Sequence, residues 1–310
     1  MSLAQSVLTH DPRAASRLLS LIEDGDPRAA AELKELYRHT GKSYLIGITG
    51  PPGSGKSTLA DQLIAHYRSK GLRLGVLAVD PSSHFSGGAV LGDRIRMQRH
   101  ATDSDVFIRS MANRNWPGGL SQATAEAVRV LEAYGCDPVI VETVGVGQSE
   151  VEVAHLAYTT ILVCTPAMGD KIQALKAGVI EVADIVVMNK ADLPDAEHAS
   201  KSIEMIVGMK PAAAWRVPVV RMVARDGKGI DELTGAIEAH RRAMELTGIL
   251  TRKKRETATR HLRDIICRKL YETARARLPE DSELEQYAEQ LMRSSTDPYS
   301  LAEEVVRRLG

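Results

Sequence analysis

The chain has 310 residues, of which 44% are hydrophobic, and this is enough for one large folded domain with helical additions. Lys plus Arg and Asp plus Glu both count 40, so no net charge favours nonspecific binding to nucleic acid or to an anionic membrane. No signal-peptide core opens the sequence, and no run approaches the roughly 20 apolar residues that span a bilayer. We therefore expect a cytoplasmic protein with neither nucleic-acid nor membrane partners.

The beginning of the chain predicts two short helices. Each is opened by an Asp-Pro pair, Asp11-Pro12 and Asp26-Pro27, in which Asp serves as N-cap and Pro as first helical residue. Gly25 and Gly41 provide the stops. We interpret residues 1–43 as an N-terminal helical extension.

Beyond residue 43 the sequence changes to short apolar, β-branched runs separated by helical segments. The runs are Tyr44–Thr49, Leu74–Val79, Val139–Val141, Thr160–Cys164, Ile185–Met188 and Val217–Arg221. Runs that are apolar throughout indicate strands covered on both faces, and helices between them indicate a mainly parallel sheet. The prediction is an α/β domain over residues 44–240, followed by a helical C-terminal arm over residues 241–310, where Arg, Glu, Leu and Ala recur with helical periodicity.

The three cysteines stand far apart in the chain. They are Cys136, Cys164 and Cys267, and two of them lie inside apolar runs. This spacing favours small buried side chains over disulfides or a metal site. We expect all three to be buried.

A phosphate-binding loop follows the first apolar run and leads into a predicted helix over Thr58–Ser69. It reads Gly50-Pro51-Pro52-Gly53-Ser54-Gly55-Lys56-Ser57. The glycines let consecutive backbone N–H groups face phosphates, and the helix N-terminus adds partial positive charge. Lys56 is expected to reach the outer phosphates and the Ser57 hydroxyl to bind Mg²⁺, with Thr58 next to the nucleotide. The sequence therefore predicts a nucleotide-binding P-loop protein.

A tetrad that recognises guanine follows another predicted strand: Asn189-Lys190-Ala191-Asp192. A carboxylate at Asp192 accepts from both the ring N–H and the amino group of guanine, whereas adenine leaves that charge unpaired. The step Val223-Ala224, after a further strand, stands where a backbone contact to the base is expected, although the usual Ser-Ala is absent. The tetrad predicts GTP rather than ATP.

Between the two motifs, an apolar strand ends in Glu142 and is followed by Gly145, which matches the second phosphate loop of GTPases with Glu142 in place of the usual Asp. The acid would hold Mg²⁺ through a water, and the Gly145 N–H would sense the γ-phosphate. Val146 stands where Ras-like GTPases carry a water-orienting Gln, so we predict slow intrinsic hydrolysis, with Gln148 as an alternative for that task.

Two further acids are candidates for the metal region. Asp80 ends the predicted strand Leu74–Val79, and Asp93 follows a Gly-rich stretch. Open α/β sheets bind their ligands at the carboxyl ends of the strands, which is where both acids are expected. The alternative for Asp80 is a turn cap before Pro81.

The ordered segments GITGPPGSGKST, LAVDPSS, GGAVLGDRIRM, VETVGVGQSE, GDKIQALKAG and NKAD resemble the MeaB family. These G-protein chaperones, called ArgK-type or LAO/AO transport proteins in older usage, serve adenosylcobalamin-dependent methylmalonyl-CoA mutase. The resemblance is specific over residues 44–240 and weaker at both ends. It implies a SIMIBI-class G domain, a homodimer formed through the C-terminal arm, and a partner mutase that itself holds the cobalamin. The mutase's adenosyltransferase is a further candidate partner.

Position by position, the resemblance assigns roles to the predicted site. Phosphate and Mg²⁺ go to Lys56 and Ser57, the metal region to Asp80, Asp93 and Glu142, and guanine to Asn189, Lys190 and Asp192. Gly169–Ala177 matches a switch that responds to the partner; Ala177 replaces a common second Lys there, which leaves Lys176 or Lys171 to activate hydrolysis.

Several functional hypotheses stay open at this level. A small-molecule kinase shares the Gly47–Thr58 loop, and an ATPase that energises basic amino-acid uptake follows the older family label. A binding module that does not hydrolyse nucleotide is a third alternative. The acyl-CoA mutase served is also open among methylmalonyl-CoA, 2-hydroxyisobutyryl-CoA, isobutyryl-CoA and ethylmalonyl-CoA enzymes.

Overall fold

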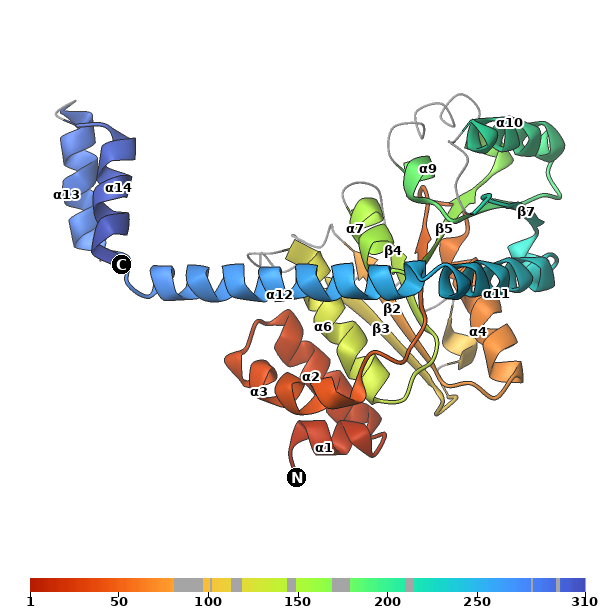
Figure 1. The fold of residues 1–310 in the computed structure, drawn as a ribbon, viewed down its shortest axis with the longest axis horizontal. Helices are drawn as coiled ribbons and strands as arrows, with labels where there is room; N and C mark the ends of the chain where they lie inside the picture. The colour runs from red at the N-terminus through yellow and green to blue at the C-terminus, as the bar shows by residue number, and fades with distance from the viewer. Residues whose placement is uncertain are drawn as a thin grey trace. The chain divides into compact units, whose positions relative to one another are not determined.

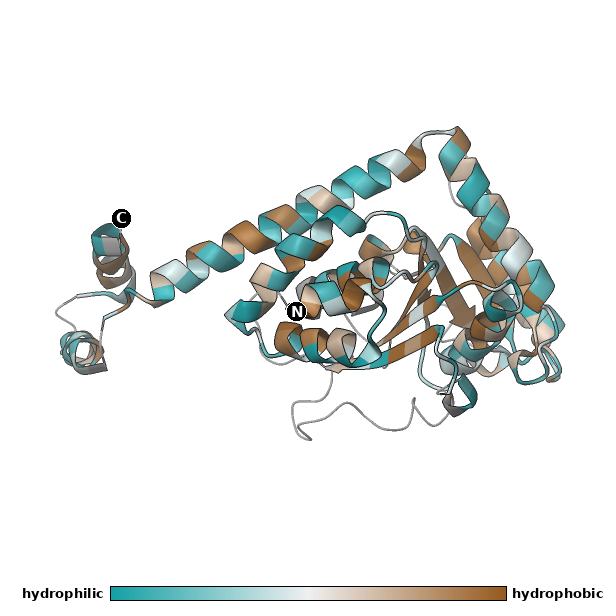
Figure 2. Ribbon diagram, turned by 90° about the horizontal axis from the view of Figure 1, so that it is seen from below, coloured by the Kyte–Doolittle hydropathy of each residue, from teal (hydrophilic) through white to brown (hydrophobic). Residues whose placement is uncertain are grey.

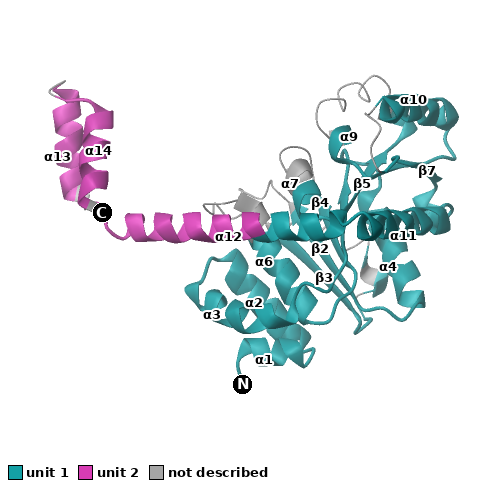
Figure 3. Ribbon diagram, in the orientation of Figure 1, with its two compact units in different colours: residues 1–258 teal, residues 259–310 magenta. Residues whose placement is uncertain are grey.

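The computed structural model describes residues 1–80, 97–100, 102–112, 119–143, 149–168, 179–209, 215–279, 281–293 and 296–309. The chain divides into two compact units, residues 1–258 and 259–310 (Figure 3). The long helix α12 (Ile249–Arg275) crosses from the first unit into the second. The three-part division at residues 43 and 240 stays a prediction.

The first unit is built on a parallel sheet. Among the described residues it has seven strands in the order β3-β2-β4-β1-β5-β6-β7, and every neighbouring pair is parallel. The strands are β1 (Leu45–Thr49), β2 (Leu74–Asp80), β3 (Val106–Ala112), β4 (Val139–Thr143), β5 (Thr159–Cys164), β6 (Ile185–Asn189) and β7 (Val219–Met222). The predicted α/β class with a parallel sheet is confirmed (Figure 1).

Strand β3 was not among the strands predicted from the sequence. Its polar Arg109 and Ser110 interrupt the apolar run that marks the other strands. The structure explains why a charge is tolerated there, because the Arg109 guanidinium pairs with Glu23 and donates to the Ser20 hydroxyl at 3.1 Å, both on helix α2 (Pro12–Glu23). Helix α2 therefore pairs the one charge of this edge strand, while Phe107 and Met111 of the same strand are buried in the main core.

Helices cover both faces of the sheet. On one face, α4 (Lys56–Ser69) packs on β1, β2 and β4, and α11 (Ile230–Leu246) packs on β5, β6 and β7. On the other, α6 (Gly119–Ala133) and α7 (Ser149–Leu156) contact each other and β4, while α9 (Val179–Val182) contacts β5 and α10 (Ala196–Gly208) contacts β6 and β7. Short 3₁₀ turns lie at Tyr37–His39, Gln98–His100, Pro166–Met168 and Ala224–Asp226.

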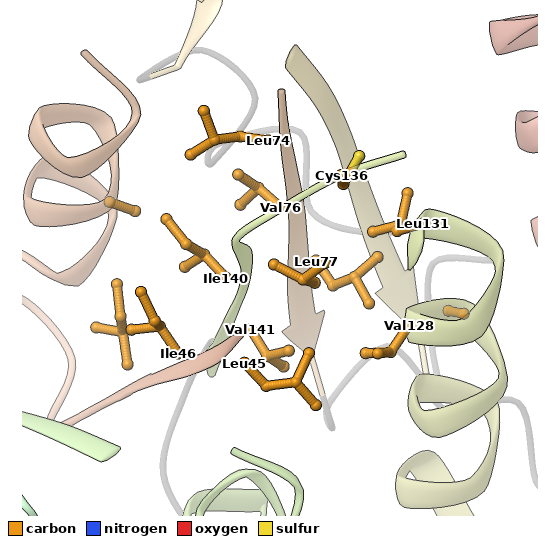
Figure 4. Packing of buried hydrophobic residues seen from close by; sticks show 14 of the residues in the cluster. Leu45, Ile46, Leu74, Val76, Leu77, Val128, Leu131, Cys136, Ile140 and Val141 are labelled. Atoms are coloured by element: carbon orange, nitrogen blue, oxygen red, sulfur yellow. The ribbon is translucent and has the colours of Figure 1, made fainter. Parts of the chain in front are cut away.

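The side chains between the sheet and the helices that cover it are apolar on both faces of the sheet. β1, β4, β5 and β6 are buried along their whole length, as the uninterrupted apolar runs predict. In β5 and β6, Val163 and Val187 belong to the main core with α11, whereas Leu162 and Met188 pack with α9 and α10. Figure 4 shows the part of the core around β2, and Figure 2 shows the apolar residues gathered in the strands.

The N-terminal helices form a cap on α6. The Asp11 and Asp26 carboxylates each accept from the backbone N–H two residues on, which confirms both predicted N-caps of α2 and α3 (Pro27–Leu36). A third helix, α1 (Leu3–Leu8), was not predicted because it is short and has no Asp-Pro signal; the Ser2 hydroxyl caps it by accepting from the Gln5 N–H.

The second unit consists of the rest of α12 with α13 (Asp281–Met292) and α14 (Pro298–Leu309). It carries Cys267, which is exposed, so the expectation that all cysteines are buried is wrong for this one. Cys136 and Cys164 are buried, and burial raises the pKa of each thiol to about 12. Among the described helices, none combines the length and apolarity needed to cross a bilayer.

Candidate functional site

The phosphate loop connects β1 to α4 at the carboxyl edge of the sheet. The last residue of β1 is Thr49 and α4 begins at Lys56, so the loop opens a helix as the sequence predicts. The Lys56 side chain is buried and its Nζ donates to the carbonyl oxygens of Gly50 at 2.8 Å and Pro51 at 3.1 Å. The ammonium charge is thereby fixed within the curve of the loop.

Ser57 and Glu142 meet although they are 85 residues apart in the chain. The Ser57 hydroxyl donates to Glu142 Oε1 at 2.6 Å, and both side chains are buried. Glu142 lies on β4, which pairs with β1 on one side and β2 on the other. The sheet order therefore brings the loop hydroxyl and the strand-end acid into contact.

The other members of the predicted metal and switch regions are placed only in part. Asp80 is the last residue of β2. Ala78, two residues earlier in the same strand, lies opposite Glu142 of β4. The Asp80 side chain lies outside the described residues. Asp93, Gly145, Val146, Gln148 and the Gly169–Ala177 segment with Lys171 and Lys176 also lie outside the described residues.

Asn189 joins three parts of the site. It ends β6, its Nδ2 donates to the Ser54 carbonyl at 2.8 Å, and its Oδ1 accepts from the Ala224 N–H at 3.0 Å. The neighbouring Lys190 has a left-handed φ of 58°, and its Nζ donates to the Gly53 carbonyl at 3.0 Å. The phosphate loop, the tetrad and the Val223-Ala224 step therefore form one connected structure.

A pocket of ≈ 210 Å³ lies beside this junction. Its lining residues are Gly55, Thr58, Asn189, Lys190, Asp192, Leu193, Val223, Ala224 and Arg225. The pocket brings together the predicted Thr58, Asp192 and Val223-Ala224, which come from three separate segments. These are the residues that the sequence predicts to contact the nucleotide.

Arg225 at the pocket rim was missed from the sequence. Its guanidinium lies 3.8 Å from the Asp192 carboxylate and donates to Asp226 at 2.9 Å. The pKa of Arg225 is raised above its ordinary value, mainly by the hydrogen bond to Asp226. Its position directly after Val223-Ala224 was the available signal.

Gly55 is required by the contact between the loop and Asn189. Its φ is +95°, and a Cβ there would lie 2.2 Å from Asn189 Nδ2. Gly53 also has a positive φ, +74°, but a Cβ there would meet nothing within 4 Å. Comparing substitutions at Gly53 and Gly55 therefore separates the cost of backbone strain from the cost of the collision with Asn189.

Gly55→Ala is therefore expected to lower the free energy of unfolding by about 2–4 kcal/mol, since strain and overlap add. Gly53→Ala should cost about 1–2 kcal/mol, from strain alone. Urea unfolding without nucleotide measures both. Equal losses in the two variants would show that the Asn189 contact does not restrict residue 55.

Comparison with known proteins shows the family to which the chain belongs. Residues 15–278 match the family model described as "Methylmalonyl Co-A mutase-associated GTPase MeaB". A putative GTPase of Pyrococcus abyssi is 44% identical over 303 residues, 96% of this chain and 93% of its own length. The GTPase ArgK of Escherichia coli is 36% identical over 275 residues, 84% and 83% of the two chains.

A mitochondrial mouse protein and a solved structure extend the comparison. The "Methylmalonic aciduria type A homolog" of Mus musculus is 36% identical over 264 residues, 82% of this chain and 61% of its own. The crystal structure titled "LAO/AO transport system kinase" has a TM-score of 0.72 at 26% identity, with 99% and 96% of the two chains covered. The chain belongs to the MeaB family of P-loop GTPases and hydrolyses GTP.

Proposed function

We propose that this GTPase is a chaperone of an adenosylcobalamin-dependent acyl-CoA mutase, and that GTP binding and hydrolysis control the loading of the mutase's cofactor or the exchange of a damaged one. The observation that carries the proposal is the family match over residues 15–278, whose description names methylmalonyl-CoA mutase. The name of the mouse relative, which refers to methylmalonic aciduria, supports the same partner class. The cobalamin is held by the mutase in this proposal.

The chemistry we propose is in-line attack of water on the γ-phosphoryl group. Lys56 and the loop amides stabilise the charge that develops on the transferred and leaving oxygens. Asp192 accepts the two guanine donors, while Asn189 holds the phosphate loop against the Ala224 segment through bonds of 2.8 and 3.0 Å. Little covalent chemistry is asked of the protein, so positioning and electrostatics supply most of the rate.

The donor set beside Lys56 fits Mg²⁺. A hydroxyl and a carboxylate in contact at 2.6 Å, Ser57 and Glu142, offer the hard oxygen ligands that this ion prefers. No cluster of three His, Cys, Asp or Glu able to hold a metal occurs among the described residues, and Mg²⁺ at phosphate loops usually takes few protein ligands. We propose Ser57, Asp80, Asp93 and Glu142 as the metal region; the ion, when bound, neutralises charge on the phosphates.

The switch roles rest on sequence. We propose that the Gly145 N–H senses the γ-phosphate, and that slow basal hydrolysis follows because Val146 has no group that orients water. Lys176 is proposed to act when the partner is bound. By reciprocity, a mutase that changes nucleotide affinity must itself bind with an affinity that depends on the nucleotide.

A homodimer formed through the C-terminal arm is part of the proposal. On α12, Leu262, Ile266 and Leu270 are exposed by 59%, 48% and 66% and are spaced four residues apart, which puts them on one helix face. Such an apolar line favours burial against a second copy. A monomer mass in light scattering would contradict this arrangement.

The purified protein is expected to hydrolyse GTP slowly and to turn over faster when a cobalamin-dependent mutase from the same organism is added. Phosphate release is measured with GTP and with ATP, with and without the mutase. The Lys56→Ala variant with the same mutase is the matched control for contaminating activity. GTP turnover unmoved by any such mutase would remove the partner and leave the GTPase.

The kinase and transport-ATPase hypotheses are not favoured. Relatives over most of the chain are named GTPases, and Asn189 and Asp192, which we propose to recognise guanine, line the pocket beside the phosphate loop. Faster phosphate release from ATP than from GTP would instead favour the kinase or the transport ATPase.

A further inference from the structure

A second pocket, of ≈ 140 Å³, lies in the first unit at the amino ends of β5 and β6. Since the strands are parallel, this is the sheet edge opposite the phosphate loop, which follows the carboxyl end of β1. Its lining residues are Asp184, Trp215, His240, Ala243, Met244, Thr247, Ile249 and Lys253. None of them belongs to the nucleotide site, and they include a buried imidazole.

His240, on α11, is 3% exposed and lies in a chain of hydrogen bonds. Its Nδ1 is 2.8 Å from the Thr159 hydroxyl, which is 2.7 Å from the Tyr44 hydroxyl. Its Nε2 is 3.5 Å from Asp184 Oδ1. Neutral His240 fits this arrangement with Nε2–H toward Asp184 and Nδ1 accepting from Thr159.

Asp184 is shared between His240 and α12. Its Oδ2 accepts from the Thr160 N–H at 2.9 Å and lies 3.6 Å from Lys253 Nζ. The same Nζ donates to the Tyr158 carbonyl at 3.1 Å. Lys253 therefore fastens the first turns of α12 to the start of β5 and β6.

The charged groups that face the imidazole are Asp184, before β6, and Lys253, on α12. Tyr44, before β1, reaches the imidazole through Thr159, and the Arg241 guanidinium lies 4.9 Å from the Tyr44 ring. A second proton on His240 must sit on Nδ1 and reverses the hydrogen bond to Thr159. It also puts two cations against one carboxylate.

We propose that His240, Asp184 and Lys253 form a proton-operated clasp, in which protonation of His240 draws Asp184 away from Lys253 and loosens the first turns of α12. Burial lowers the pKa of His240 below its ordinary value, and Lys253 lowers it further while Asp184 raises it. The unfolded chain takes up this proton near its ordinary pKa of about 6.5. The clasp is therefore intact above that pH and is lost as the pH falls through the lower pKa of folded His240.

Trp215 reports on the clasp directly. Its indole ring centroid is 4.8 Å from that of His240, and its Nε1 donates to the Asp184 carbonyl at 2.8 Å. The chain has two tryptophans, so a Trp116→Phe background leaves Trp215 as the sole tryptophan, and its emission is read with excitation at the red edge of the indole band, where tyrosine does not absorb. Because a charged imidazole quenches indole fluorescence, emission should fall on acidification with a midpoint below about 6.5.

Substitutions predict opposite shifts of that midpoint. His240→Gln should abolish the transition. Lys253→Met should raise the midpoint, because a repelling cation is removed, and Asp184→Asn should lower it, because the attracting charge is removed. Lys254→Met is the matched control, since the Lys254 Nζ donates to the Gly41 carbonyl and does not face His240.

Hydrogen exchange tests the loosening of α12. Protection of residues 249–258, corrected for the intrinsic rate at each pH, should fall across the same midpoint in the wild type and stay constant in His240→Gln. A Trp215 transition that persists in His240→Gln, or α12 protection unchanged across the midpoint, overturns the clasp. Should His240→Gln fail to fold, midpoint shifts of the same sign in Lys253→Met and Asp184→Asn overturn it.

Discussion

Lys56→Ala is expected to reduce GTP hydrolysis by roughly 10³-fold, because a charge aimed at the transferred phosphoryl group is removed from a preorganised loop. The Lys56 side chain is buried, and its Nζ is held by the Gly50 and Pro51 carbonyls at 2.8 and 3.1 Å. Lys56 is also the one basic residue in the loop sequence Gly50–Ser57, so no other side chain of the loop supplies that charge. Single-turnover phosphate release at saturating GTP measures the chemical step.

The control for this variant is Lys70→Ala. Lys70 is an exposed lysine at the other end of the same helix, so the Lys70→Ala substitution removes the same charge without changing the loop. Urea unfolding of both variants separates loss of catalysis from loss of fold. Wild-type turnover in a folded Lys56→Ala protein would refute the role of this lysine.

Asp192→Asn is expected to weaken GTP binding by roughly 10²-fold and to improve binding of xanthosine triphosphate. The carboxylate that accepts two guanine donors becomes an amide that offers N–H groups, which face a donor in guanine but the 2-oxo acceptor in xanthine. Asp192 lines the pocket beside the loop, so the exchange acts at the base rather than at the phosphates. Competition binding with GTP, XTP and ATP measures the change.

Asp195→Asn is the matched control, three residues further along. Asp195 is exposed and has a left-handed φ of 68°, a conformation that Asn adopts readily. It should leave all three affinities unchanged. Unaltered selectivity for GTP in Asp192→Asn would remove this residue from base recognition, and an equal loss for GTP and XTP would indicate damage to the pocket.

The parallel sheet was predictable because its central strands are apolar on both faces. β1, β4, β5 and β6 appear within a residue or two of the predicted runs. Strand β3 was not predictable in the same way, because Arg109 reads as a surface residue until its partner Glu23, 86 residues away in sequence, is known. Cys267 was misjudged for a related reason, since the apolar residues around it lie on a helix that remains exposed.

The sequence by itself determined the phosphate loop, the tetrad and the parallel α/β class, because each depends on neighbouring residues or on a local period. Only the tertiary structure decided which residues meet: Ser57 with Glu142, Asn189 with both Ser54 and Ala224, and His240 with Thr159 and Asp184. Hydrogen bonds and burial act over a few ångströms in space, whatever the separation in the chain, and no local pattern records them.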